Sequence, residues 1–86
     1  MNYQEILTEN PKSAQSYPRH SVEFFDDAEM KSRFYLNIDN LKGGAEDKIE
    51  SIVDSYLDDH PDIQKAVAYR EESPDSRFAF REFGRN

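Results

Sequence analysis

The clearest hydrophobic pattern in the chain lies in residues 43–60, GGAEDKIESIVDSYLDDH. Apolar side chains recur there at the spacing of a helix that buries one side, namely Ile49, Ile52, Val53, Tyr56 and Leu57. We predict an amphipathic helix that begins near Gly44 or Ala45. It ends before Pro61, because the residue preceding a proline avoids the α region.

Alternating apolar and polar positions predict four β-strands around this helix. They cover residues 21–27, 31–38, the second half of 62–72, and 77–83. The short turns within each pair predict two antiparallel hairpins. Residues 62–72 also fit a second helix, because Ile63, Ala66 and Val67 would then share one stripe. That alternative would leave a three-stranded sheet.

The predicted order ββαββ indicates an α+β fold, with a four-stranded, largely antiparallel sheet and one main helix packed on one face. Residues 1–20 contain two prolines and are predicted to form a flexible or partly ordered N-terminal arm, which could include a short helix. Residues 21–83 form the single domain, and residues 84–86 form a tail. The predicted core comprises Val22, Phe24, Phe34, Leu36, Ile38, Ile49, Ile52, Val53, Tyr56, Leu57, Val67, Tyr69, Phe78 and Phe80.

Composition favours a small acidic binding protein. Eighteen acidic residues outnumber eleven basic ones, and the net charge of −7 repels nucleic acid and attracts basic partners. Solubility or a salt-adapted host would also explain this charge. The chain has no cysteine, no signal-peptide pattern and no apolar run of membrane-spanning length, so we expect a cytoplasmic protein.

The polar side of the predicted helix carries acidic residues at every fourth position. Like charges at this spacing cost roughly 0.2–0.5 kcal/mol per pair, and Asp58 and Asp59 also oppose the helix dipole. Uncompensated costs of this kind are typical of functional surfaces. The predicted partner-binding residues are Glu46, Glu50, Asp54, Asp58 and Asp59, together with Asp26 and Asp27 of the first turn.

The acidic positions of the predicted helix also have explanations other than partner binding. The acidic positions could form an ordinary solvated helix face, or arginines of the same chain could neutralise them. If they do bind a partner, their spacing of about 6 Å along the helix axis is comparable to that of nucleic-acid phosphates. The stripe could therefore imitate a phosphate backbone.

The sheet face away from the helix supplies an alternative interface. Its predicted residues are Arg33, Tyr35, Arg77, Arg81 and Phe83, with Asn37 and Ala79 beside them. Such side chains dominate protein interfaces and also stack on single-stranded bases. The acidic net charge and the lack of an RNA-binding sequence signature argue against nucleic acid. The N-terminal arm could also cover this face, through Tyr3, Ile6, Leu7 or Tyr17.

Catalytic and metal-binding signatures are weak. The stretch from Asp58 to Asp62 combines carboxylates with His60, but it lacks a second histidine and a calcium-loop glycine. The sequence Lys42-Gly43-Gly44 lacks the rest of a phosphate-binding loop. We therefore predict no catalytic residue, no metal and no cofactor.

The leading hypothesis is a stoichiometric protein–protein binder that docks its acidic helix face on a basic surface. Small acidic proteins of this kind include phage anti-defence proteins, polymerase inhibitors, immunity proteins and antitoxins, an analogy based on size and charge alone. The expected partner is a nucleic-acid-handling protein of a phage or bacterial system. The alternative is a nucleic-acid-binding or homodimerising module that uses the outer sheet face, and an enzyme ranks third.

Overall fold

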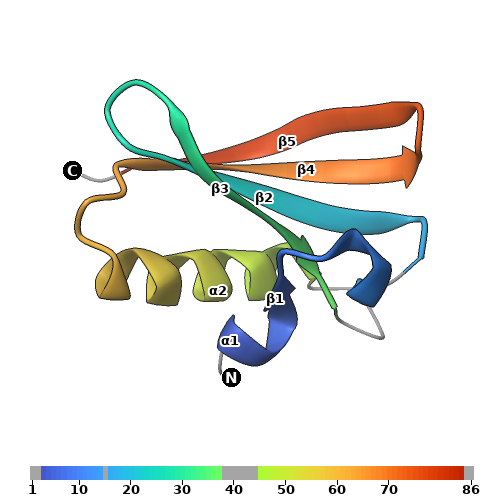
Figure 1. The fold of residues 1–86 in the computed structure, drawn as a ribbon, viewed down its shortest axis with the longest axis horizontal. Helices are drawn as coiled ribbons and strands as arrows, with labels where there is room; N and C mark the ends of the chain where they lie inside the picture. The colour runs from blue at the N-terminus through green and yellow to red at the C-terminus, as the bar shows by residue number, and fades with distance from the viewer. Residues whose placement is uncertain (1–2, 15, 38–44, 85–86) are drawn as a thin grey trace.

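The computed structural model describes residues 3–14, 16–37 and 45–84, which form one antiparallel sheet and one long helix (Figure 1). The elements are α1 (Tyr3–Ile6), β1 (Leu7–Thr8), the 3-10 helix η1 (Pro11–Ser13), β2 (Arg19–Phe25), β3 (Met30–Leu36), α2 (Ala45–Asp59), β4 (Lys65–Ser73) and β5 (Ser76–Gly84). The fold is therefore α+β, as predicted. Within these residues, no helix is both long enough and apolar enough to cross a membrane.

The sheet has five strands in the order β1-β3-β2-β4-β5, and each neighbouring pair is antiparallel. The predicted count of four strands is corrected by β1, where Leu7 and Thr8 pair with Leu36 and Tyr35. A two-residue strand is too short for alternation to reveal it. The question left open for residues 62–72 is also resolved, since β4 occupies residues 65–73.

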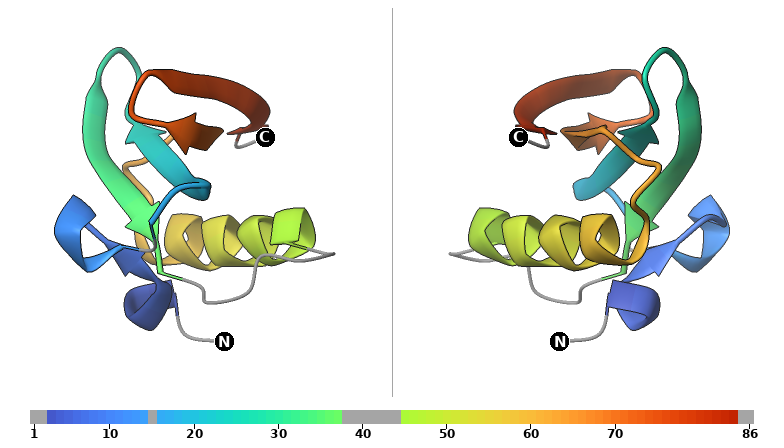
Figure 2. Two further views of the ribbon diagram at one scale, coloured as in Figure 1. Left: turned by 90° about the vertical axis from the view of Figure 1, so that its right-hand side faces the viewer. Right: turned by 90° about the vertical axis from the view of Figure 1, so that its left-hand side faces the viewer.

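Helix α2 packs against one face of the sheet, and the elements α1 and β1 lie toward the same side of the molecule (Figure 2). The predicted stripe of α2 is confirmed, because Ile49, Ile52, Val53, Tyr56 and Leu57 are all buried. These residues meet Val22 and Phe24 of β2 and Leu36 of β3 in a single core.

The core face of β4 differs from the prediction. Ala66 and Ala68 face the core, and Val67 and Tyr69 therefore point to the opposite face of the sheet. Both sides of this strand carry apolar residues, so alternation alone cannot choose between them. The pairing of Ala66 with Phe24 and of Ala68 with Val22 decides it.

Strand β5 contains an irregularity that reverses the predicted facing of its second half. The register shifts between Ala68 and Tyr69, so that Phe80 is an extra residue between two paired positions. Beyond this bulge Arg81 lies opposite Ala68, and Phe83 lies opposite Ala66 on the helix side. Phe80 packs against the core, but Phe78, predicted to be buried, is 49% exposed. Phe34, also predicted to be in the core, is partly buried against it. The remaining core prediction, Ile38, lies outside the described residues.

The N-terminal segment contributes to the core through its first elements and reaches the outer face through Tyr17. Ile6 and Leu7 are buried, and Tyr3 packs against the same cluster. The backbone N–H of Asn37 donates to the carbonyl of Ile6 at 2.8 Å, which ties the segment to the end of β3. Of the four residues considered for covering the outer face, Tyr17 lies there, with the guanidinium of Arg19 over its ring.

Candidate functional site

Acidic side chains gather at the end of the molecule where α2 terminates. The loop after α2 meets the β2–β3 turn there, because the N–H of Gln64 donates to the carbonyl of Phe25 at 2.8 Å. Figure 1 places this end opposite the β4–β5 turn. We call its exposed carboxylates the acidic end, which comprises Asp27, Glu29, Asp54, Asp58, Asp59 and Asp62.

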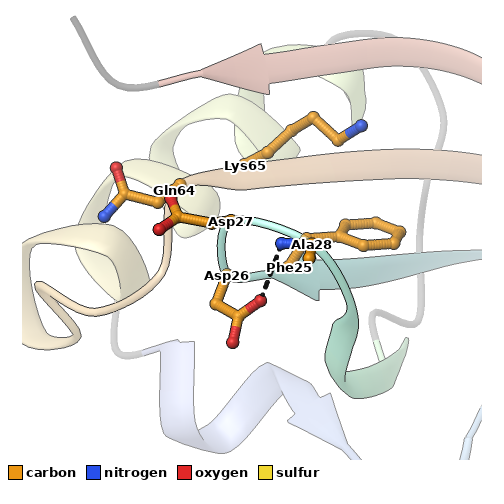
Figure 3. Close-up of a pocket in the computed structure, with 6 residues that line it drawn as sticks. All are labelled: Phe25, Asp26, Asp27, Ala28, Gln64 and Lys65. Carbon is orange, nitrogen blue, oxygen red and sulfur yellow. Dashed lines mark hydrogen bonds between the residues drawn. The ribbon is translucent and has the colours of Figure 1, made fainter.

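The β2–β3 turn at the acidic end borders a shallow pocket of about 200 Å³, shown in Figure 3. Asp26 is a structural residue of this turn, because its Oδ1 accepts the N–H groups of Ala28 and Glu29, each at 3.0 Å. Hydrogen bonds from the backbone N–H groups of Ala28 and Glu29 hold the pKa of Asp26 below its usual value. The side chain of Lys31 makes a smaller contribution in the same direction. Asp27, by contrast, is exposed.

The predicted acidic positions of α2 have different environments. Arg81 of β5 pairs with Glu50 at 3.0 Å, so an arginine of the same chain neutralises one of them. The Oδ2 of Asp59 accepts the hydroxyl of Tyr3 at 2.9 Å. Asp54 and Asp58 are exposed, and no salt bridge within the described part of the chain engages either one. The side chain of Glu46 lies outside the described residues.

The outer face of the sheet carries a network of ion pairs, which we call the arginine–glutamate layer. It comprises Arg19, Glu23, Arg33, Glu71 and Arg77. Glu71 accepts from Arg19 at 2.8 Å and from Arg77 at 3.0 Å. Glu23 accepts from Arg33 at 2.6 Å and from Arg77 at 3.1 Å. Both carboxylates are almost fully buried, at 6% exposure for Glu23 and 4% for Glu71.

Tyrosine rings complete this layer. The guanidinium carbon of Arg19 lies 4.3 Å from the ring centre of Tyr17 and 4.6 Å from that of Tyr35. Arg77 lies 3.6 Å from the ring centre of Tyr69. Burial, together with a hydrogen bond to Glu23, raises the pKa of the Tyr69 hydroxyl. The rings and guanidinium groups thus shield the two carboxylates from water.

Hydrogen bonds keep the carboxylates of the layer ionised. Burial alone would raise the pKa of Glu23, but bonds from Arg33, Tyr69 and Arg77 outweigh it and lower that pKa. The pKa of Glu71 is lowered in the same way. Burial alone would raise it, but hydrogen bonds from Arg19, Ser21 and Arg77 outweigh that effect. Each burial cost is therefore offset by charge-assisted hydrogen bonds.

The alternative interface is only partly assembled. Arg33, Tyr35 and Arg77 do share the outer face, but the two guanidinium groups are engaged by Glu23. Arg81 and Phe83 lie on the helix side, which corrects their predicted position. Much of the positive charge on this face is therefore matched within the chain.

An aromatic pocket of about 340 Å³ lies between the N-terminal segment and α2, and no pattern in the sequence predicts it. We define the aromatic pocket by its lining residues Tyr3, Gln4, Leu7, Glu9, Phe34, Tyr56 and His60. The ring of Tyr56 stacks on His60 at 3.9 Å, and the ring of Tyr3 meets Tyr56 edge-on at 5.5 Å. These residues come from three separate segments, so only the folded arm brings them together.

No protein-family model, curated protein or solved structure matches this chain. In the part of the chain that the structure describes, no group of three or more His, Asp or Glu side chains is placed to hold a metal ion. This also holds for the stretch from Asp58 to Asp62. The functional argument therefore depends on the geometry and charge of the surfaces described above.

Proposed function

We propose that this protein is a small cytoplasmic binder that docks its acidic end on a basic surface of a partner protein. It would act by occupying that surface stoichiometrically, as an inhibitor of a nucleic-acid-handling protein does. The observation that carries the proposal is the exposure of Asp54 and Asp58 on one face of α2, with Asp27 and Asp62 exposed at the same end.

Local energetics support this proposal. Asp54 and Asp58 are four residues apart on one helix and repel each other, and Asp58 also lies beside the negative end of the helix dipole. The last turn of α2 contains no basic residue that would relieve this cost. A cationic partner would offset both the repulsion between the two carboxylates and the unfavourable interaction with the helix dipole. It would add positive charge where the helix terminus and the side chains are negative.

Imitation of nucleic-acid phosphates is the specific form of docking that we propose. Asp54 and Asp58 are separated by about 6 Å along the helix axis, similar to successive phosphates on one strand. A protein surface built from Lys and Arg to hold such phosphates would accept the acidic end. Direct contact with nucleic acid is not expected, since the carboxylates would repel it.

Affinity capture from a lysate of the source cells tests this proposal. We expect the wild-type protein to retain a basic partner at low salt and to release it at high salt, because exposed charges are screened. The variant Asp54→Lys/Asp58→Lys should lose the partner. Its control is Glu72→Lys/Asp75→Lys, which makes the same charge change near the β4–β5 turn. Equal capture by both double variants would contradict the proposal.

A further inference from the structure

The aromatic pocket has the size and walls of a site for one side chain of a partner. Its volume of about 340 Å³ lies at the lower end of the range for ligand sites. Tyr3 of α1 and Phe34 of β3 line it together with Tyr56 and His60 at the end of α2. Aromatic rings attract cations, because the face of each ring carries negative charge density.

Ring contacts fix the orientation of these walls. Tyr56 is 7% exposed, and its ring stacks on Phe24 at 3.9 Å and on His60 at 3.9 Å. The ring of Phe34 meets Tyr56 edge-on at 5.5 Å. Tyr56 therefore forms the base of the pocket, and a bound group would contact the more exposed rings of Tyr3, Phe34 and His60.

Carboxylates give the pocket a negative rim. Glu9 lines it and is exposed, and Asp59 holds the hydroxyl of Tyr3 at 2.9 Å. Neither lysine nor arginine occurs among the described residues that line it. Charge and aromatic character thus favour the same kind of occupant, a cation with a flat apolar surface.

A backbone carbonyl orients the ring of His60. Its Nδ1 lies 2.8 Å from the carbonyl oxygen of Tyr56. A carbonyl oxygen only accepts, so Nδ1 carries a proton and donates it. This hydrogen bond holds the ring of His60 in place as one wall of the pocket.

We propose that the aromatic pocket binds the guanidinium group of an arginine of the partner protein. Arginine fits better than lysine, because its planar group stacks on rings and donates to carboxylates in a fixed fork. This inference rests on the proposed function, since it supplies one arginine of the basic surface that the acidic end would dock on. Asp59 belongs to both the acidic end and the surroundings of the pocket.

Titration of the full chain with blocked arginine, Nα-acetyl-arginine-methylamide, tests the pocket by NMR. We expect saturable shifts of the ring signals of Tyr3, Phe34 and His60, and weaker binding of the equivalent blocked lysine. Tyr3→Leu should weaken arginine binding roughly two- to fivefold. Tyr3→Phe should bind nearly as well as the wild type, because it keeps the ring and loses only the hydroxyl.

A matched pair of variants tests the rim. Glu9→Gln should weaken blocked-arginine binding, and Glu5→Gln, which removes the same charge from α1 outside the pocket, should not. The proposal is overturned if the three rings show no saturable shift, if blocked lysine binds equally well, or if both glutamine variants bind alike.

Arginine binding in the pocket and docking of the acidic end can be tested independently. Blocked arginine does not need the acidic end, so Asp54→Lys/Asp58→Lys should still show saturable shifts of the pocket rings. A protein that captures its partner through Asp54 and Asp58 but does not bind blocked arginine would overturn only this inference. Arginine binding without any partner capture would overturn only the proposed function.

Discussion

Glu71 shows how single residues stabilise the outer face of the sheet. It is 4% exposed and accepts hydrogen bonds from Arg19, Ser21 and Arg77. Arg19 is itself only 7% exposed. A buried guanidinium that loses its carboxylate keeps its desolvation cost without compensation. The stability of this face therefore depends strongly on Glu71.

Glu71→Gln should lower the free energy of unfolding by about 3 kcal/mol, since one partner of a buried pair is removed. Glu72→Gln is the matched control. Glu72 is the next residue, and it pairs with Arg70 where the side chains are 41% and 50% exposed. Its loss should cost less than about 1 kcal/mol. Equal effects in urea unfolding would contradict the role assigned to Glu71.

Acid should destabilise the protein through the same layer. Glu23 and Glu71 have folded-state pKa values below the usual 4.5. A lowered folded-state pKa means that the stabilisation is fully present above pH 4.5 and is lost as the pH falls through the folded-state pKa. Urea unfolding between pH 7 and pH 3 should show this decline. The decline should be shallower in Glu71→Gln, and an unchanged slope would contradict the assignment.

Sequence reasoning identified which residues of β3 face outward but not what they contact. Alternation placed Arg33 and Tyr35 on the outer face correctly. The pairing of Glu23 with Arg77 was not identified, because β2 and β5 come near each other only through β4, and the sequence does not show this strand order. Ion pairs between strands distant in sequence leave no periodic signal along the chain.

At the scale of elements, α2 was the most predictable part of the fold. Its apolar stripe has an unambiguous period, and the helix ends at Asp59, two residues before Pro61. The faces of β4 and β5 were not predictable in the same way. Apolar residues occupy both sides of β4, and the extra residue Phe80 reverses the alternation in β5. The aromatic pocket was missed because it depends on contacts of the short elements α1 and β1.

The charge pattern of α2 yields a stability prediction. Asp58→Lys should raise the free energy of unfolding by roughly 0.5–1 kcal/mol, because a cation at the helix C-terminus complements the dipole and pairs with Asp54. Glu82→Lys makes the same charge change on β5 and should have little effect on stability. Chemical denaturation of both variants checks this, and no stabilisation by Asp58→Lys relative to Glu82→Lys would contradict it.

At the scale of the whole molecule, charge is arranged differently on different surfaces. The outer face matches its arginines with Glu23 and Glu71, whereas the acidic end exposes carboxylates that no described salt bridge engages at Asp27, Asp54, Asp58 or Asp62. Figure 1 shows that α2 ends on the side of the molecule opposite the β4–β5 turn. This separation makes variants near that turn suitable controls for docking.

The rate of association with a captured partner, measured across ionic strength, tests the central claim most directly. Wild type and Glu72→Lys/Asp75→Lys should associate fast at low salt and slow steeply as salt rises, because exposed charges steer the encounter. Asp54→Lys/Asp58→Lys should associate about tenfold more slowly at low salt and depend little on salt. Equal rates for the two double variants at every salt concentration would contradict docking through the acidic end.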